Sequence, residues 1–380
     1  KNTTMAYQKL RGDHLFNGKN LLGSDTVLIL DELGHKVDII PLSEAGSDVQ
    51  YIQGAILPGM VNAHCHLELS HMKGKIREKT GLVDFLLAVL KGRGSGTEQI
   101  EKAMAEAYTQ MEADGIRIVG DVCNTAQTIS IKNTQSIRFH NFIEMISLTE
   151  AQVASRGELA IHLMNEFNAN QPWPSSLSPH AAYTVHPAAM PFLNERTKDQ
   201  IITIHNQETK AENELFEKGT GDLLRLYTIF GHASSPLPST GTTSLRSYLH
   251  FFNKGQKIIL VHNTFMSEED IIWADELAQK NGIKLYHCFC VNANLFIEDR
   301  LPNIPLFIKH NCAIVLGTDS LSSNWSLQIS DEMNTILNKY DGISIEQCLS
   351  WVCNTGWELF GLKPVWITGS NLIERMQHRQ

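Results

Sequence analysis

The 380-residue sequence lacks features that would place it in several common classes of protein. No run approaches the roughly 18 consecutive apolar residues of a membrane span, and the opening KNTTMAYQKL lacks the apolar stretch of a signal peptide. Basic residues are fewer than acidic ones, 32 against 41, whereas a phosphate-binding surface needs clustered Lys and Arg. We therefore expect a small-molecule substrate, no nucleic-acid partner and no membrane partner, with homo-oligomer formation left open.

The seven cysteines lack the paired C-x-x-C spacing of a zinc knuckle or a thioredoxin-like site. Their odd number is typical of free thiols in a reducing compartment, so we expect a cytoplasmic protein. Hydrophobic residues make up 42% of the chain and charged residues 19%, as in ordinary globular proteins. The composition thus leaves an enzyme or a ligand-binding protein as the main classes.

Short β-type runs recur along the chain and alternate with amphipathic stretches of helical type, such as LVDFLLAVLKGR and EEDIIWADELAQKNG. Such alternation predicts an α/β fold on a parallel sheet, and eight units favour a closed (β/α)8 TIM barrel. A doubly wound open sheet is the competing architecture, but no glycine-rich phosphate-binding motif follows the first run. The eight expected strands cover residues 55–67, 115–124, 137–146, 175–185, 201–208, 257–264, 283–290 and 313–320.

Further β-type runs lie on both sides of the expected barrel. Three precede it, in DTVLILDELGHK, KVDIIPL and YIQGAIL, and the closing LKPVWITGSNLIERM also has strand character. We expect the barrel to span residues 57–359 and a small β domain to combine residues 1–56 with 360–380.

Polar side chains occur late in most of the expected barrel strands, where a buried strand should be apolar. The carboxyl ends of parallel barrel strands meet at one mouth, where barrel enzymes of this kind carry out their chemistry. We expect the polar strand-end residues to converge there: His64, His66, His180, His205, His262, His287 and Asp319.

Alternation along NAHCHLELSH separates its candidate ligands, because side chains two positions apart share a face of a strand. His64 and His66 are expected to face inward, whereas Cys65 faces the surrounding helices. If the strand continues, Glu68 follows the inward row at the rim, and His71 falls beyond it.

Two imidazoles from H-x-H, a third from His205 and the Asp319 carboxylate would form a nitrogen-and-oxygen site with room for water. This donor set predicts one divalent metal ion, with Zn²⁺ favoured and Fe²⁺ or Mn²⁺ also suitable. The ordinary alternative for any histidine is a core imidazole bonded to the backbone. That alternative applies most to His180 and His287, which have no defining spacing partner.

These residues resemble the amidohydrolase superfamily, in particular its branch of nucleobase and nucleoside deaminases and chlorohydrolases. The resemblance spans residues 57 to 324 and is carried by LPGMVNAHCHLELS, SPHAAYTV, HNQET, LVHNTF, HCFCVNANL and LGTDS. It implies that the metal ligands are His64, His66, His205 and Asp319. It also implies that Glu208 transfers protons and that His262 polarises the substrate or orients the attacking water.

The resemblance further implies a small β-sandwich built from both chain ends around the barrel. Relatives with two metals bridge them by a lysine on the fourth strand, and SSLSPHAAYTV contains no lysine, so one metal is expected. Two departures are HCFCVNAN, where relatives resemble HCPxSN, and a closing segment that is short for half of a β-sandwich.

The expected reaction is hydrolytic deamination of an amino-substituted nitrogen heterocycle, such as an adenosine derivative or aminodeoxyfutalosine. Hydrolysis of a cyclic amide or a ring chloride is the enzymatic alternative, and a non-catalytic metal-binding barrel is the alternative from another class. Residues 209–256 could form a lid or an ordinary surface excursion. The expected roles are catalysis for Glu208, His262 and Asp319, and substrate contact for Glu68, His180 and His287.

Overall fold

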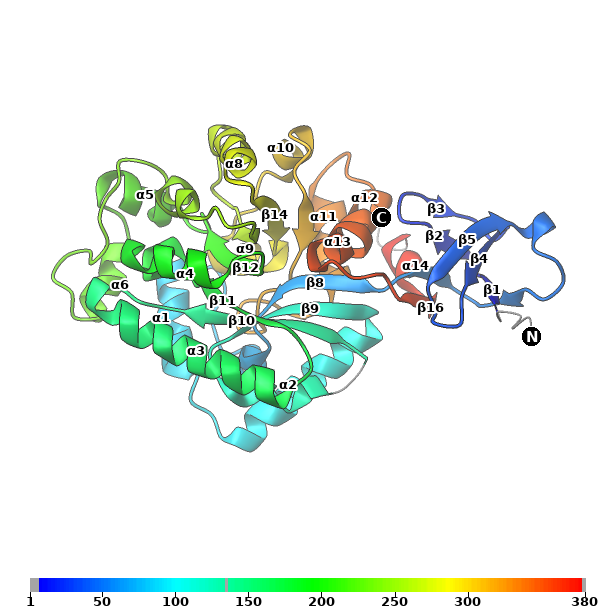
Figure 1. Ribbon diagram of the computed structural model, residues 1–380, viewed down its shortest axis with the longest axis horizontal. Coiled ribbons are helices and arrows are strands. Elements are labelled where there is room, and N and C mark those ends of the chain that lie inside the picture. Colours follow the sequence, from blue (N-terminus) through cyan, green and yellow to red (C-terminus); the bar gives the residue numbers. More distant parts are fainter. Residues whose placement is uncertain (1–6, 134–135, 378–380) are drawn as a thin grey trace.

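The computed structural model describes residues 7–133 and 136–377, and its centre is made of parallel strands (Figure 1). These strands form two four-stranded sheets, with the orders β11-β10-β9-β8 and β12-β13-β14-β15. Each of the eight expected barrel runs contains one of them. The strands are β8 (Met60–Cys65), β9 (Ile116–Cys123), β10 (Arg138–Met145), β11 (Ser175–Pro179), β12 (Ile201–Asn206), β13 (Lys257–His262), β14 (Lys284–Phe289) and β15 (Ile314–Leu316).

The two sheets are joined by backbone hydrogen bonds on both sides. The N–H of His205 donates to the carbonyl of His180 (2.9 Å), and the N–H of Thr318 donates to the carbonyl of His64 (3.0 Å). A separate apolar cluster lies between the sheets, since it takes side chains from both. The chain therefore has a TIM-barrel-type α/β fold, and the clustered strand residues are Ala63, Val122, Phe142, Ile259, Val261, Tyr286, Cys288 and Val315.

Helices cover the outer faces of the sheets, and local signals fix several of their ends. Helix α8 begins after Ser267, whose side chain accepts a hydrogen bond from the N–H of Asp270, and ends at Gly282 in a left-handed conformation. The helices are α1 (Leu82–Gly92), α2 (Thr97–Ala113), α3 (Val153–Asn170), α4 (Met190–Arg196), α5 (Lys210–Lys218), α6 (Leu223–Ile229), α7 (Ser244–Tyr248), α8 (Glu268–Asn281), α9 (Val291–Glu298), α10 (Ile304–Lys309), α11 (Ile329–Lys339), α12 (Ile345–Ser350) and α13 (Gly356–Phe360).

A smaller β unit lies at one end of the molecule and contains two further four-stranded sheets, β5-β4-β1-β6 and β16-β7-β2-β3 (Figure 1). Leu10 and Leu28 from the first sheet pack with Leu15 and Ile56 from the second. Residues 1–6 and 378–380 of the expected small domain lie outside the described residues. The strands are β1 (Gln8–Arg11), β2 (His14–Phe16), β3 (Leu21–Leu22), β4 (Thr26–Leu30), β5 (Lys36–Pro41), β6 (Gln50–Tyr51), β7 (Ala55–Pro58) and β16 (Trp366–Ser370).

The expected first barrel strand, residues 55–67, is in fact two strands that belong to different sheets. Strand β7 pairs with β16 in the small unit, whereas β8 pairs with β9 in the centre. Gly59 separates them, and its N–H donates to the carbonyl of Val365. A Cβ at this position would lie 2.4 Å from Cγ of Arg117, so only glycine fits the crossing without a shift of that side chain.

The closing segment is only partly a strand, and the cysteines are all free thiols. The closing segment is a strand only as far as Ser370, after which helix α14 (Leu372–Gln377) follows. All seven cysteines are free thiols, six of them buried, as expected. None of the helices within residues 7–133 and 136–377 has both the length and the apolar character needed to cross a bilayer.

Candidate metal and substrate site

Four side chains from the expected ligand set converge where β8, β12 and β15 end. Nε2 of His66 lies 3.1 Å from Nε2 of His64 and 3.3 Å from Nε2 of His205. Oδ1 of Asp319 lies 3.4 Å from Nε2 of His66 and 3.6 Å from Nε2 of His64. All four side chains are buried, and their ligand atoms lie within 4.8 Å of one another.

The donor chemistry of this set fits a divalent metal ion. Nδ1 of His205 donates to the carbonyl of His180 at 2.7 Å, so the Nε2 lone pair of the neutral ring points into the cluster. Burial lowers the pKa of His66 to about 3, which keeps that ring neutral as well. Burial opposes ionisation of Asp319, but hydrogen bonding to His64 and the nearby His66 hold its pKa below the usual range. Neutral imidazoles beside an ionised carboxylate suit Zn²⁺.

Cys65 and His71 do not take part in this set. Cys65 packs in the large hydrophobic cluster that the strands form with the helices, as strand alternation predicts. His71 has its two ring nitrogens 3.1 Å and 3.2 Å from the backbone carbonyl oxygens of Glu68 and Arg93. Neither residue therefore contributes a donor atom to the four-ligand set.

The backbone adopts rare conformations at the residues that end these strands. Gln207, His262, Asn263 and Asp319 all have positive φ, between 44° and 74°. Non-glycine residues in this region carry a conformational cost, and such residues cluster at functional sites. The fold thus holds His262 and Asp319 in fixed, strained positions at the mouth.

Glu208 and His262 face each other across the mouth. Oε1 of Glu208 accepts a 2.5 Å hydrogen bond from the Tyr183 hydroxyl, and its Oε2 lies 3.6 Å from Nε2 of His262. Burial raises the pKa of Glu208 to about 8, so the group is a neutral carboxylic acid at neutral pH. Nδ1 of His262 donates to Oδ1 of Asn294 (2.9 Å), which leaves its Nε2 as an acceptor facing Glu208.

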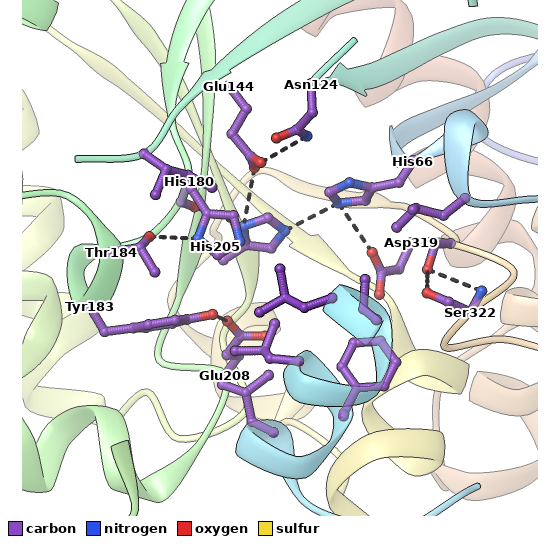
Figure 2. Close-up of a pocket in the computed structure, with 18 of the residues that line it drawn as sticks. His66, Asn124, Glu144, His180, Tyr183, Thr184, His205, Glu208, Asp319 and Ser322 are labelled. Carbon is purple, nitrogen blue, oxygen red and sulfur yellow. Dashed lines mark hydrogen bonds and ion pairs between the residues drawn. The ribbon is translucent and has the colours of Figure 1, made fainter. Parts of the chain in front are cut away.

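These groups form the floor of a cavity of about 220 Å³ whose wall is mostly apolar (Figure 2). We define the floor as the polar groups at the strand ends, which are His66, His180, His205, Glu208, His262 and Asp319. We define the wall as the apolar side chains contributed by α1, by α6 with the residue after it, and by α9. They are Leu82, Phe85, Leu86, Val89, Leu90, Leu226, Phe230 and Ile297.

His180 lies in the floor beside a carboxylate that the sequence analysis missed. The His180 ring is centred 4.7 Å from that of His205, and its Nδ1 lies 2.6 Å from Oγ1 of Thr184. Glu144, near the end of β10, lies 4.0 Å from Nδ1 of His205 and accepts a hydrogen bond from Asn124. Burial raises the pKa of Glu144 to about 7. An acidic residue near the end of the β-type run RFHNFIEM was the available signal.

Glu68 is buried outside the floor. The strand does not continue to it, because residues Leu67–Met72 form a 3-10 helix, so the expected alternation stops at Cys65. Its carboxylate accepts hydrogen bonds from Arg93 and from the Thr125 hydroxyl, each at 2.9 Å. Arg93 lines the cavity, so Glu68 contacts a lining residue but does not itself line the cavity.

His287 is a wrong assignment, because it faces away from the cavity. Its neighbours Tyr286 and Cys288 pack in the cluster between the sheets, and alternation therefore turns His287 toward the helices. Its ring centroid lies 4.9 Å from that of Phe307 in α10. The position of His287 correctly indicated the C-terminal end of β14, but it did not indicate which face of the strand the side chain occupies.

The connection over residues 209–256 is largely helical and carries α5, α6 and α7. Leu226 and Phe230 from this connection line the cavity, so it forms part of the wall. Phe230 is 40% exposed and therefore lies at the rim, open to solvent.

Known proteins resemble this chain in sequence and in fold. Residues 55–365 match the model of the Amidohydrolase family. Aminodeoxyfutalosine deaminase of Nitratiruptor sp. is 24% identical over 295 residues, which are 74% of this chain and 67% of that protein. The structure of Helicobacter pylori aminofutalosine deaminase with methylthio-coformycin superposes with a TM-score of 0.82 at 18% identity, covering 98% of this chain and 96% of that one. Zinc-complexed atrazine chlorohydrolase from Arthrobacter aurescens gives a TM-score of 0.69 at 16% identity, covering 94% and 84%.

Proposed function

Because the chain belongs to the amidohydrolase family, we propose that it is a metal-dependent aminohydrolase. It replaces an amino group on a nitrogen heterocycle by oxygen and releases ammonia, and its substrate is a nucleobase or a purine nucleoside-like compound. The observation that carries this proposal is the buried Glu208 beside His262, in one cavity with the four-ligand set. Metal binding alone would need neither residue.

His64, His66, His205 and Asp319 hold one divalent ion, with zinc favoured by the three imidazoles and one carboxylate. When bound, such an ion acidifies a water molecule for attack on the ring carbon. Strand β11 (Ser175–Pro179) contains no lysine to bridge a second ion in this set, which supports a single metal.

The protein groups share the proton transfers. Asp319 is ionised and accepts the proton that the attacking water loses. Glu208 is protonated, fixed by the Tyr183 hydroxyl, and donates its proton to a ring nitrogen. It then passes the proton taken up by Asp319 to the leaving amine, which departs as ammonia. His262 is held by Asn294 with Nε2 toward the reacting groups and orients the water. His180 contacts the heterocycle, and Glu68 positions Arg93 at the cavity.

We also propose that the eight central strands close into a (β/α)8 barrel over residues 57–359. The hydrogen bonds between β11 and β12 and between β8 and the residues after β15 support closure. The two sheets of the small unit, which share a core that includes Leu10 and Ile56, form the β-sandwich, with β16 supplied by the end of the chain.

A product screen tests the proposed reaction. The purified protein is analysed for metal and incubated with purines, pyrimidines, their nucleosides, 5′-deoxyadenosine and aminodeoxyfutalosine, and ammonia release is measured. Chloride and ring-opened acids are measured in parallel on chlorotriazines and cyclic amides, since the similarity to atrazine chlorohydrolase favours that reaction as the second candidate. Bound metal without hydrolysis of any compound in the panel would contradict the proposed hydrolase activity and favour a non-catalytic metal-binding barrel.

A further inference from the structure

A second group of metal-ligating side chains lies on the outer side of the strands, apart from the cavity. Asp275 of α8, His287 of β14 and Cys312, two residues before β15, each place one ligand atom within 4.8 Å of the others. The three come from separate segments and share no residue with the cavity lining. The proposed function uses none of them.

The imidazole of His287 is buried without the partner that such a group needs. The residue is only 1% exposed, and its Nδ1 has no hydrogen-bond partner. Buried polar atoms are nearly always paired, so an unpaired ring nitrogen points to a missing ligand. The His287 ring packs against Phe307. Burial lowers the pKa of His287 to about 3, so the ring stays neutral and keeps a lone pair that can bind a metal ion.

Cys312 and Asp275 supply a thiol and a carboxylate that are both partly open to solvent. Burial and the neighbouring Asp275 raise the pKa of Cys312 to about 12, and burial also raises the pKa of Asp275. Without a cation, the Asp275 carboxylate thus opposes ionisation of the Cys312 thiol. A divalent ion would reverse that effect, because the ion replaces the proton on the sulfur and the proton is released to solvent.

We propose that Asp275, His287 and Cys312 bind a second divalent metal ion of the zinc class, with water as the fourth ligand. One thiolate, one imidazole and one carboxylate form a borderline-soft set that suits Zn²⁺. The ion would connect helix α8 to β14 and to the segment just before β15. Its role is structural, because its ligands lie outside the cavity and on the opposite side of β14 from the inward-facing Cys288.

Sulfur makes the second site distinguishable from the site at the mouth. The mouth set has only nitrogen and oxygen donors, so a thiolate-to-cobalt charge-transfer band in Co²⁺-loaded protein reports on the outer site alone. The proposal therefore does not depend on the proposed reaction, and either can fail without the other.

The experiment uses the full chain, stripped of metal under reducing conditions and titrated with Co²⁺, with Zn²⁺ content measured separately. We expect about two ions per chain and a near-ultraviolet thiolate band that is complete at micromolar free metal. Cys312→Ser should lose the band and one ion while retaining turnover. Asp275→Asn is a second variant, for use if the serine variant folds poorly, and it should weaken the band. Glu276→Gln, at an exposed position on the same helix, is the matched control and should behave as wild type.

The site is overturned if wild-type protein shows no thiolate band, or if the band forms only at millimolar Co²⁺. A band that persists in Cys312→Ser would likewise assign the sulfur to another cysteine and refute the set. Loss of the band in His205→Ala with an intact fold would show that it does not belong to an independent site.

Discussion

The floor and the wall of the cavity are built by opposite means. Floor residues stand at the ends of parallel strands, and hydrogen bonds to neighbouring side chains and carbonyls hold His205, Glu208 and His262. The wall consists of apolar side chains on connecting helices, and at its rim Leu90 and Phe230 are 50% and 40% exposed. The position of the floor residues depends on the strands of the fold. The wall residues lie on connections between strands, so they can change without changing the floor.

The strongest way to break the floor is to remove a ligand. His205→Ala should lose the metal and reduce turnover to below about 10⁻⁴ of wild type, because no activated water remains. Metal content by mass spectrometry and ammonia release would be measured together. His71→Gln is the control, since that ring faces backbone carbonyls and should leave the metal in place. A metal content in His205→Ala that equals that of the wild-type protein would remove His205 from the ligand set.

Glu208→Gln separates proton transfer from metal binding within the floor. The amide keeps the shape of the side chain but has no proton to transfer, so turnover should fall by about 10²- to 10⁴-fold with metal retained. Glu214→Gln, on the following helix outside the cavity, should retain turnover. Unchanged activity in Glu208→Gln would exclude the assigned role.

The pH dependence sharpens the same assignment. The pKa of Glu208 is raised to about 8, so the required acid form is present below that pH and is lost above it. We expect kcat/KM to fall as pH rises through about 8, approaching about tenfold per pH unit. The residual activity of Glu208→Gln should lack this decline. A wild-type profile that stays flat well above pH 8 would contradict a protonated Glu208.

The smallest effect is expected from the wall. Phe230→Ala removes apolar contact at the rim, so KM should rise by about tenfold while kcat changes little. Ile229→Ala is a matched control, because Ile229 is adjacent and 54% exposed but does not line the cavity. Equal effects of the two variants on KM would show that the substrate does not reach this part of the wall.

The sequence predicted the floor far better than the wall. Histidines at His64, His66 and His205 interrupt apolar strands, and the period of two in a strand assigns their faces once the inward face of each strand is known. For β14 that face was taken from the position of His287 alone, and the assignment was wrong. Glu68 was misplaced because hydrophobic alternation does not show where a strand gives way to a 3-10 helix.

The wall could not be predicted, because apolar residues on a helix look the same whether they face a core or a cavity. Leu86 and Val89 fit an ordinary amphipathic helix, and only the three-dimensional arrangement shows that they border the floor. Glu144 illustrates a different limit. The sequence shows an acidic residue in the expected strand. It does not show the hydrogen bond from Asn124 to Glu144, because these residues come from different segments of the chain.

The pairing of β16 with β7 has a consequence for how the protein is made. Strand β7 leads through Gly59 directly into the strand that carries His64 and His66, yet its partner Trp366 is synthesised some three hundred residues later. On the ribosome, β7 therefore lacks its partner strand β16 until nearly the whole described chain has emerged. Metal capture at the mouth would then follow the synthesis of β16.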